Sequence, residues 1–289
     1  MGYVATIGFF DGVHIGHRYL IDQVKAVAQT QGLQSAVLTF DEHPQTVLNG
    51  AAQPLLSTFQ ERTQLLKQTG IDEIFSFHFD VIQQLTAEEF MRILHAQCGV
   101  QVLLMGYDHQ FGSDQMTDFA DYAVVAQRVG LQLQAITVAP QGEVSSSKIR
   151  RALRVGDIPR ANEMLGYAYS LTGEVVHGKG IGHQLGFPTA NIHVAEDKLL
   201  PANGVYEVQV DGLDGTLKAL LNIGTNPTIG NSQVSVELHI PHFDGNLYAQ
   251  TLTVRLVRLI REERKFANLE ELQQQIANDI DSIQHLGVD

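Results

Sequence analysis

Apolar residues in the first half of the chain follow two patterns that alternate. Short continuous apolar runs, typical of buried strands, are followed by stretches in which apolar residues recur every three or four positions, as in amphipathic helices. Strands are predicted at residues 4–10, 35–40, 74–79, 100–105 and 131–138. Helices are predicted to begin near residues 14, 58, 86, 117 and 145. This alternation of strand and helix predicts a parallel α/β sheet.

Two of the predicted helix starts carry a second local signal. Thr58 and Thr86 are each followed three positions later by a glutamate, which is the capping box of a helix N-terminus. Parallel α/β sheets bind ligands at the carboxyl ends of their strands. We therefore expect His14, Asp41 and Asp108, each of which follows a predicted strand, to converge at one edge of the sheet.

The second half of the chain loses this pattern from about residue 170 onward. Apolar and polar residues alternate there, and strands are predicted at 171–177, 206–210, 217–223, 234–240 and 251–260. Short strands without intervening helices predict a small antiparallel β-barrel or a sandwich. The alternation slips by one position at Leu256 and Val257, which predicts a bulge in the last strand.

A final helix is predicted to begin at Asn268, with Glu271 three positions further on. Its expected apolar stripe consists of Leu269, Leu272, Ile276, Ile280 and Ile283. Because the pattern changes between residues 166 and 170, we expect two domains, 1–168 and 169–289.

Composition narrows the possible functions. The chain has 289 residues and a net charge of −13, which argues against a protein that holds nucleic-acid phosphates through a broad basic surface. No apolar run approaches the ~20 residues that a membrane-spanning helix needs. A single cysteine, Cys98, excludes an internal disulfide and a multi-cysteine metal site. We expect a cytoplasmic protein that binds neither nucleic acid nor membrane.

Two histidines, His14 and His17, lie where the first predicted strand gives way to the first helix. The unpaired N–H groups of a helix start favour anions such as phosphate. Gly12 and Gly16 would let a ligand approach the backbone closely. The three-residue spacing puts both imidazoles on one face of the first turn, where they could hydrogen-bond a phosphate as charge builds on it.

A second candidate phosphate site begins a basic helix in this acidic chain. Ser146 and Ser147 supply hydroxyls, and Lys148 and Arg150 supply positive charge. Taken alone, the segment is explained more simply by serine capping followed by basic surface residues. Together with the histidine junction, the phosphate interpretation is favoured.

A glycine-rich stretch follows the first strand of the second half, with glycines at Gly178, Gly180, Gly182 and Gly186. Such loops can cradle phosphates through backbone N–H groups, although this one lacks the ending of a Walker A motif. Thr189 and Asn191 follow and offer oxygen ligands suited to Mg²⁺. A hairpin loop rich in turn residues, including Pro188, is an equally good interpretation.

Glu237 lies on the polar side of the predicted strand 234–240. A solvated strand face is the simpler explanation of such a residue. If the polar face of a barrel lines the mouth of a pocket instead, Glu237 could act as general base for a hydroxyl nucleophile.

These motifs resemble one family in their order along the whole chain, the bifunctional riboflavin kinase/FMN adenylyltransferases. The matching segments are 8–17, 106–112, 145–150, 185–191, 224–228, 236–238 and 261–266. The most specific is Leu-Gly-Phe-Pro-Thr-Ala-Asn at 185–191, because it follows a domain with the histidine junction. The resemblance implies a Rossmann-like nucleotidyltransferase domain followed by a riboflavin kinase-like β-barrel with a terminal helix.

The resemblance also implies two consecutive reactions on small-molecule substrates by a monomer or weak homo-oligomer. The second domain would phosphorylate riboflavin with ATP to FMN, with Glu237 as base and Thr189 and Asn191 holding Mg²⁺ or another hard divalent cation. The first would adenylylate FMN to FAD with release of pyrophosphate, with His14 and His17 as catalytic residues. Further implied ligand contacts are Gly8, Phe9, Asp11, Gly12, Gly16, Gly106, Asp108, Ser146, Ser147, Lys148, Arg150, Gly178, Gly180, Gly182, Gly186, Pro188 and Arg264.

Some residues depart from the family pattern and keep alternatives open. Residues 113–118 are acidic where the family commonly has a basic, glycine-containing run, and His183 stands where an arginine is common. One alternative is therefore a riboflavin kinase with a weakened or inactive adenylyltransferase domain. Another is a flavin- or nucleotide-binding regulatory protein without turnover.

Overall fold

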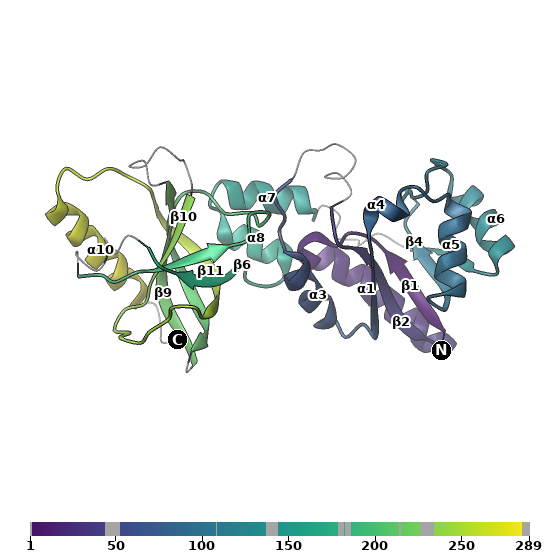
Figure 1. Cartoon of the computed structure of the whole chain (residues 1–289), viewed down its shortest axis with the longest axis horizontal. Coiled ribbons are helices and arrows are strands. Elements are labelled where there is room, and N and C mark those ends of the chain that lie inside the picture. Colours follow the sequence, from purple (N-terminus) through teal and green to yellow (C-terminus); the bar gives the residue numbers. More distant parts are fainter. Residues whose placement is uncertain are drawn as a thin grey trace. The chain divides into compact units, whose positions relative to one another are not determined.

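The computed structural model describes residues 2–43, 53–107, 109–136, 144–178, 182, 186–213, 215–225 and 234–284. They belong to two compact units, Met1–Ser146 and Ser147–Asp289 (Figure 1). The helices that follow residue 146 group with the second unit. The boundary between functional domains at residues 168 and 169 stays a prediction.

The first unit contains the predicted parallel sheet. Its strands are β1 (Tyr3–Ile7), β2 (Gln34–Phe40), β3 (Glu73–Phe77), β4 (Val100–Met105) and β5 (Gln132–Ala135). They pair in parallel in the order β3-β2-β1-β4-β5. Strand β1 ends three residues earlier than predicted, because the backbone at Phe10 turns into the left-handed region with φ of 57°.

The helices of this unit are α1 (Ile15–Gln31), α3 (Phe59–Lys67), α4 (Phe79–Ile82), α5 (Ala87–Ala96) and α6 (Phe119–Val129). The capping boxes predicted at Thr58 and Thr86 are both present. Helix α4 and the 3-10 turn η1 (Asp11–Val13) were not predicted, because elements this short leave no hydrophobic period.

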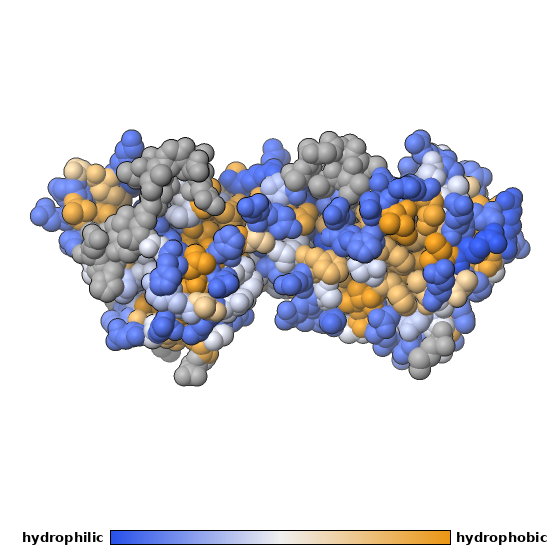
Figure 2. Space-filling view, viewed as in Figure 1, coloured by the Kyte–Doolittle hydropathy of each residue, from blue (hydrophilic) through white to orange (hydrophobic). Residues whose placement is uncertain are grey.

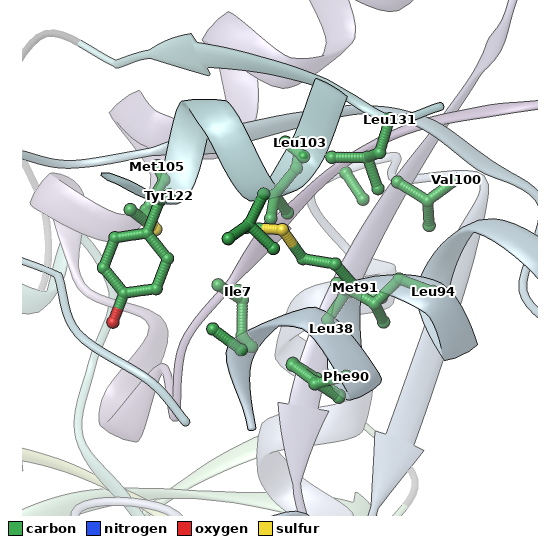
Figure 3. Packing of buried hydrophobic residues seen from close by; sticks show 14 of the residues in the cluster. Ile7, Leu38, Phe90, Met91, Leu94, Val100, Leu103, Met105, Tyr122 and Leu131 are labelled. Carbon is green, nitrogen blue, oxygen red and sulfur yellow. The ribbon is translucent and has the colours of Figure 1, made fainter. Parts of the chain in front are cut away.

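Residues of the central strands alternate between two cores, one on each face of the sheet. Val4 and Val37 pack with α1, whereas their neighbours Ala5 and Leu38 pack in the opposite cluster with α5 and α6. Figure 3 shows this second cluster, in which Phe90 and other buried side chains fill the space between helices and sheet. A sheet covered on both faces leaves the carboxyl ends of its strands as the edge open to ligands.

The second unit begins with helices α7 (Ser146–Arg154) and α8 (Ile158–Leu165) and continues as a closed antiparallel barrel. Its strands are β6 (Ser170–Val176), β7 (Ala190–Val194), β8 (Gly204–Leu213), β9 (Gly215–Thr225), β10 (Val234–His239) and β11 (Thr251–Glu262). The sequence left barrel and sandwich open, and the structure decides for a barrel with the order β10-β7-β6-β11-β8-β9. Strand β7 was missed because it follows directly on the glycine-rich stretch. The bulge predicted at Leu256 and Val257 is confirmed by a register shift between Leu256 and Arg258.

Helix α10 (Leu269–Gln284) packs against the barrel through Ile283, which is buried with Val205 and Leu220. The predicted cap is confirmed, since the Asn268 side chain accepts a hydrogen bond from the Glu271 N–H at 2.8 Å. The predicted apolar stripe is wrong at Leu269, which is 64% exposed because it begins the helix, ahead of the turns that contact the barrel.

On the face shown in Figure 2, hydrophilic residues cover much of the surface of each unit, and apolar residues are exposed among them. Exposed apolar side chains of the first unit include Val81 and Val124. None of the helices in the described part of the chain is both long and apolar enough to span a membrane.

Candidate active sites

The first candidate site lies at the end of β1, where the chain makes an unusual turn before α1. Phe10, Gly12 and Val13 have φ values of 57°, 76° and 37°. Glycine adopts this region freely, but a side chain does so only at a cost in energy. The turn delivers His14 to the N-cap of α1, so that the open N–H groups of this helix begin where the strand ends.

The rings of His14 and His17 stack with their centroids 3.6 Å apart and their planes inclined by 16°. The backbone N–H of His17 donates to Nδ1 of His14 at 3.4 Å. Because Nδ1 of His14 accepts a hydrogen bond, the proton of its neutral imidazole sits on Nε2. The edge-on contact of Phe10 with His17, at 5.2 Å between centroids, fixes the pair from the side of the turn.

Both histidines are neutral at pH 7. Burial lowers the pKa of His14 to about 4, and the nearby Asp11 carboxylate offsets only part of this effect. Burial also lowers the pKa of His17 well below its usual value, and the neighbouring His14 lowers it further. The site can therefore offer neutral imidazole N–H donors to an anion without a permanent positive charge.

Asp11 and the glycines next to the histidines mainly shape the turn. The Asp11 carboxylate is 3% exposed and accepts hydrogen bonds from the backbone N–H groups of Leu56 and Ser57, at 3.0 and 3.1 Å. A side chain at Gly16 would place its Cβ 3.2 Å from Nδ1 of His14. These residues were predicted to contact ligand, and that role stays a prediction.

Ser146 is the last residue of the first unit, and its hydroxyl donates to the backbone oxygen of Asp11 in the same turn at 3.1 Å. Of the other residues predicted in this segment, Ser147 and Lys148 are exposed and Arg150 is buried. Gly106 directly follows β4, and β4 pairs with β1 in parallel. The predicted Asp108 lies outside the described residues.

A further charged residue, not predicted from the sequence, packs against Phe9, which precedes the turn. Arg62 of α3 is fully buried, and its guanidinium lies 3.9 Å from the ring centroid of Phe9. Its side chain also donates to the backbone oxygen of Phe40 at the end of β2. Phe9, predicted as a ligand contact, is thus held between sheet and helix at the carboxyl ends of β1 and β2.

The second candidate site is a cavity of about 340 Å³ between the barrel and α10. Its walls include the apolar side chains Val205, Leu220, Phe187, Phe266, Leu272 and Ile276. Its polar lining includes Thr189, Asn222, Glu237, His239, Arg261, Glu263, Arg264 and Asp279. A concave site in which convergent polar groups stand beside apolar side chains is suited to a small molecule with an apolar ring and a polar tail.

Glu237 faces this cavity, so its side of β10 is not simply a solvated face. Its carboxylate accepts hydrogen bonds from the hydroxyls of Thr189 at 3.4 Å and Ser235 at 3.2 Å. In the sheet, Glu237 lies directly opposite Asn191 of β7 and Asn222 of β9. Directly opposite residues of an antiparallel pair share one face, so the predicted base and the predicted metal ligands come together.

Two described glycines of the glycine-rich stretch, Gly178 and Gly182, lie against these same side chains. A Cβ at Gly178 would lie 1.9 Å from Nδ2 of Asn191, and one at Gly182 would lie 2.9 Å from Oγ1 of Thr189. A Cβ at Gly182 would also lie 2.5 Å from the backbone oxygen of Phe187, so a side chain at either position would displace its neighbours. Gly186 has φ of 82°, which favours glycine as a turn residue. The predicted Gly180 lies outside the described residues.

Arg264 helps to form the wall of the cavity nearest α10. Its guanidinium lies 4.9 Å from the ring centroid of Phe266 and donates to the Gln275 side chain at 2.6 Å. Arg261 forms an ion pair with the buried Asp279 of α10 at 2.9 Å. The two arginines thus hold the helix beside the cavity.

A second hollow, of about 450 Å³, lies on the other side of Thr189. It is lined by Val175, Pro188, Thr189, Ala190, Leu238, Ile240, Phe243, Asp244, Gly245, Asn246, Leu247 and Tyr248. The Tyr248 ring stacks on His177 at 4.0 Å between centroids. Thr189 lines both hollows and therefore lies where their contents would meet.

Comparison with known proteins gives a consistent result. A family model described as FAD synthetase matches residues 1–150, and one described as riboflavin kinase matches residues 165–286. A Listeria monocytogenes protein named bifunctional riboflavin kinase/FMN adenylyltransferase is 35% identical over 283 residues, which are 96% of this chain and 90% of the relative. The Escherichia coli K12 protein of the same name is 33% identical over 284 residues, with the same coverage.

This chain belongs to the bifunctional riboflavin kinase/FMN adenylyltransferase family. It carries both the FAD synthetase and the riboflavin kinase domain of that family. A solved structure from Streptococcus pneumoniae, described as a macrolide-efflux protein, is 28% identical, covers 99% of this chain and 95% of its own, and has a TM-score of 0.85. The resemblance found in the sequence is confirmed.

Several residues of the two sites could not have been found by reading the family motifs. Arg62 and Ser57 are separated from the histidine junction by about fifty residues, and only the fold brings them there. Ser235 had a signal, because it lies two positions before Glu237 and hence on the same face of the strand. Asp279 is a buried acid on a helix whose polar residues looked solvent-facing.

Proposed function

We propose that the protein converts riboflavin to FMN and FMN to FAD, consuming one ATP in each reaction. The observation that carries this proposal is the presence of two separate constellations in a chain of this family. Glu237 with Thr189 and Asn191 lies in the barrel unit, and the stacked His14 and His17 lie at the ligand edge of the sheet unit.

In the kinase reaction, the cavity beside α10 would hold the flavin, with Phe266, Leu272 and Ile276 against its apolar ring. The ribityl 5′-hydroxyl would then reach Glu237, which accepts the hydroxyl proton. The hydroxyl oxygen bonds to the γ-phosphorus as the bond from the γ-phosphorus to the β-bridging oxygen breaks, and ADP leaves. Phosphoryl transfer depends mostly on positioning and charge neutralisation.

ATP would occupy the hollow on the other side of Thr189, with its phosphates toward Thr189. Tyr248 and His177 form an aromatic pair at this hollow, which is suited to an adenine ring. Replacing Tyr248 by alanine is expected to raise the KM for ATP several-fold in the kinase reaction. An unchanged KM for ATP would show that ATP does not bind in this hollow.

Magnesium is proposed for the kinase site on the chemistry of its donors. The hydroxyl of Thr189, the side chain of Asn191 and the carboxylate of Glu237 are hard oxygen ligands gathered in one place. Among the described residues, no group of three or more His, Cys, Asp or Glu gathers as a metal site. Thr189 and Asn191 would hold the ion, which supplies neutralisation of phosphate charge.

Adenylyl transfer needs no general base, because the FMN phosphate is already an ionised nucleophile. Its oxygen bonds to the α-phosphorus of ATP as the bond to the β-phosphate oxygen breaks, and pyrophosphate leaves. The Nε2 proton of His14 is available to hydrogen-bond the α-phosphate, and His17 supports the ring from behind. Ser146, Ser147, Lys148 and Arg150 are proposed to neutralise the departing pyrophosphate.

A chromatographic time course with riboflavin, ATP and Mg²⁺ tests the proposal. FMN that appears first and then gives way to FAD is the expected result. Accumulation of FMN without FAD would favour the alternative with an inactive first domain and would point to the atypical residues 109–118 as the cause. Folded protein that makes neither product would contradict the proposal and favour a regulatory binding protein.

We further propose a cytoplasmic protein that is a monomer or weak homo-oligomer with small-molecule substrates. The lone cysteine and the two complete constellations within one chain support this proposal. Sedimentation at micromolar concentration is expected to give the mass of one chain, 31.8 kDa. A tight, concentration-independent oligomer would contradict it.

A further inference from the structure

The turn that precedes His14 is hydrogen-bonded to a buried segment, Leu56 and Ser57, which belongs to none of the sequence motifs. Leu56 and Ser57 precede α3 and are 1% exposed each. The Asp11 carboxylate accepts hydrogen bonds from the backbone N–H groups of Leu56 and Ser57. It also accepts one from the Ser57 hydroxyl, at 3.3 Å. The same hydroxyl accepts a hydrogen bond from the backbone N–H of Gly12 at 2.9 Å.

These bonds act on the most unusual backbone of the sheet unit. Phe10 and Val13 have positive φ although neither is glycine, and Val13 is β-branched. Such conformations persist only where surrounding contacts impose them. The Ser57 hydroxyl bonds both to the Asp11 carboxylate and to the N–H of the peptide between Asp11 and Gly12. It therefore holds the Asp11 side chain and the Gly12 backbone in fixed positions within the strained turn.

The turn in turn fixes the histidines. Val13 leads directly to His14, which caps α1 and accepts the N–H of His17. The backbone oxygen of Asp11 also accepts the Ser146 hydroxyl at the start of α7. A shift of this turn would move His14, the stacked His17 and the hydrogen bond of Ser146 together. Displacements of about 1 Å in such an arrangement can cost on the order of 10²-fold in rate.

We propose that Ser57 is a positioning residue for adenylyl transfer, which fixes His14 and His17 through Asp11 and Gly12. It touches no substrate, since it is buried below the turn. The proposal rests on the proposed adenylyltransferase function. Efficient adenylyl transfer then requires a hydroxyl at position 57, which serine and threonine supply and other residues of similar size do not.

The test compares Ser57→Ala, which removes the hydroxyl, with Ser57→Thr, which keeps it. FMN and ATP are supplied directly, and kcat and KM for adenylylation are measured well below the unfolding temperature. Ser57→Ala is expected to lower kcat at least tenfold and to change the KM values less than threefold. Ser57→Thr is expected to recover most of kcat, and the riboflavin kinase rate of the same samples is expected to stay at the wild-type value.

A matched control separates positioning from stability. Leu94 is a fully buried residue of the α5 core, on the opposite face of the sheet from the cluster that contains Phe10 and Val13, so Leu94→Ala destabilises the unit elsewhere. If Leu94→Ala lowers kcat as much as Ser57→Ala when both are fully folded, Ser57 is merely structural. A kcat within twofold of wild type in Ser57→Ala would also overturn the proposal.

Ser57→Cys provides a second route if the alanine variant does not fold. Cysteine keeps the side-chain shape and weakens both hydrogen bonds, so an intermediate kcat is expected. A wild-type kcat in Ser57→Cys would contradict the hydroxyl requirement. If the wild-type protein itself makes no FAD from FMN, the proposed function fails, and that result is distinct from a Ser57→Ala variant that is as active as wild type.

Discussion

His14 and His17 stack face to face, 3.6 Å between ring centroids, although each would repel the other if both were charged. Their low pKa values resolve this conflict, because both rings are neutral at physiological pH. The stack is thus a pair of neutral donors at a helix start, ready for a phosphate that brings its own negative charge.

Stability is expected to fall as the pH falls below about 6.5, the pKa of an unperturbed histidine. The folded-state pKa of His14 lies at about 4, so between these values the unfolded chain binds a proton that the folded chain does not. The shift corresponds to about 3 kcal/mol, fully present above pH 6.5 and lost toward pH 4. Urea unfolding of the sheet unit at pH 7.5 and 4.5 measures this loss.

The variant His14→Asn serves as the control for this pH dependence. This variant lacks one of the two histidines whose pKa is lowered by folding. Its unfolding free energy should therefore vary less between pH 7.5 and 4.5 than that of the wild type. An identical pH dependence in the two proteins would mean that His14 is not the group responsible.

Glu237→Gln is expected to lower the riboflavin kinase kcat by roughly 10²-fold or more, in line with the loss of a general base. Glutamine keeps the size of the side chain and its contact with Thr189, so folding should be preserved. Adenylylation of supplied FMN should be unaffected, because the histidines lie in the other unit. Equal loss of both activities would show that Glu237 is structural.

Gly178→Ala is expected to reduce the kinase rate by about tenfold, by displacing Asn191. The added Cβ would lie 1.9 Å from Nδ2 of Asn191, so one of them must move. If Asn191 holds Mg²⁺, the variant should also need a higher Mg²⁺ concentration for half-maximal rate. A variant with the wild-type Mg²⁺ dependence would argue against Asn191 as a metal ligand, and adenylylation in the same sample is the internal control.

Leu272→Ala is expected to raise the KM for riboflavin several-fold, because Leu272 lines the cavity assigned to the flavin. Leu269→Ala is the matched control on the same helix, since Leu269 is 64% exposed and outside the cavity. Steady-state kinetics of both variants distinguish loss of cavity contacts from a general effect on α10. Equal KM values in the two variants would contradict the assignment.

The sequence predicted most of the elements because their signals are local. Capping boxes at Thr58 and Thr86, the slip at Leu256 and the cap at Asn268 all depend on residues a few positions apart. The short helix α4 carries no such signal, and β7 was hidden by the glycines before it.

The sites were predictable only in part, for a physical reason. Residues such as Glu237 and His14 belong to contiguous motifs, whereas their supports come from distant segments. Ser57 reaches Asp11 across 46 positions, and nothing in the local pattern distinguishes it from an ordinary residue before a helix. The glycines were predicted to admit phosphate, but Gly178 and Gly182 also make room for the side chains of Asn191 and Thr189.

Mixing two single-site variants tests the central claim, that the two reactions take place at two separate active sites. Glu237→Gln alone is expected to convert FMN to FAD but not riboflavin to FMN, and His17→Ala alone to stop at FMN. An equimolar mixture supplied with riboflavin, ATP and Mg²⁺ should make FAD, because FMN released by one variant is adenylylated by the other. Absence of FAD from the mixture, with both half-reactions intact, would contradict the claim. FAD made from riboflavin by either variant alone as fast as by the mixture would also contradict it.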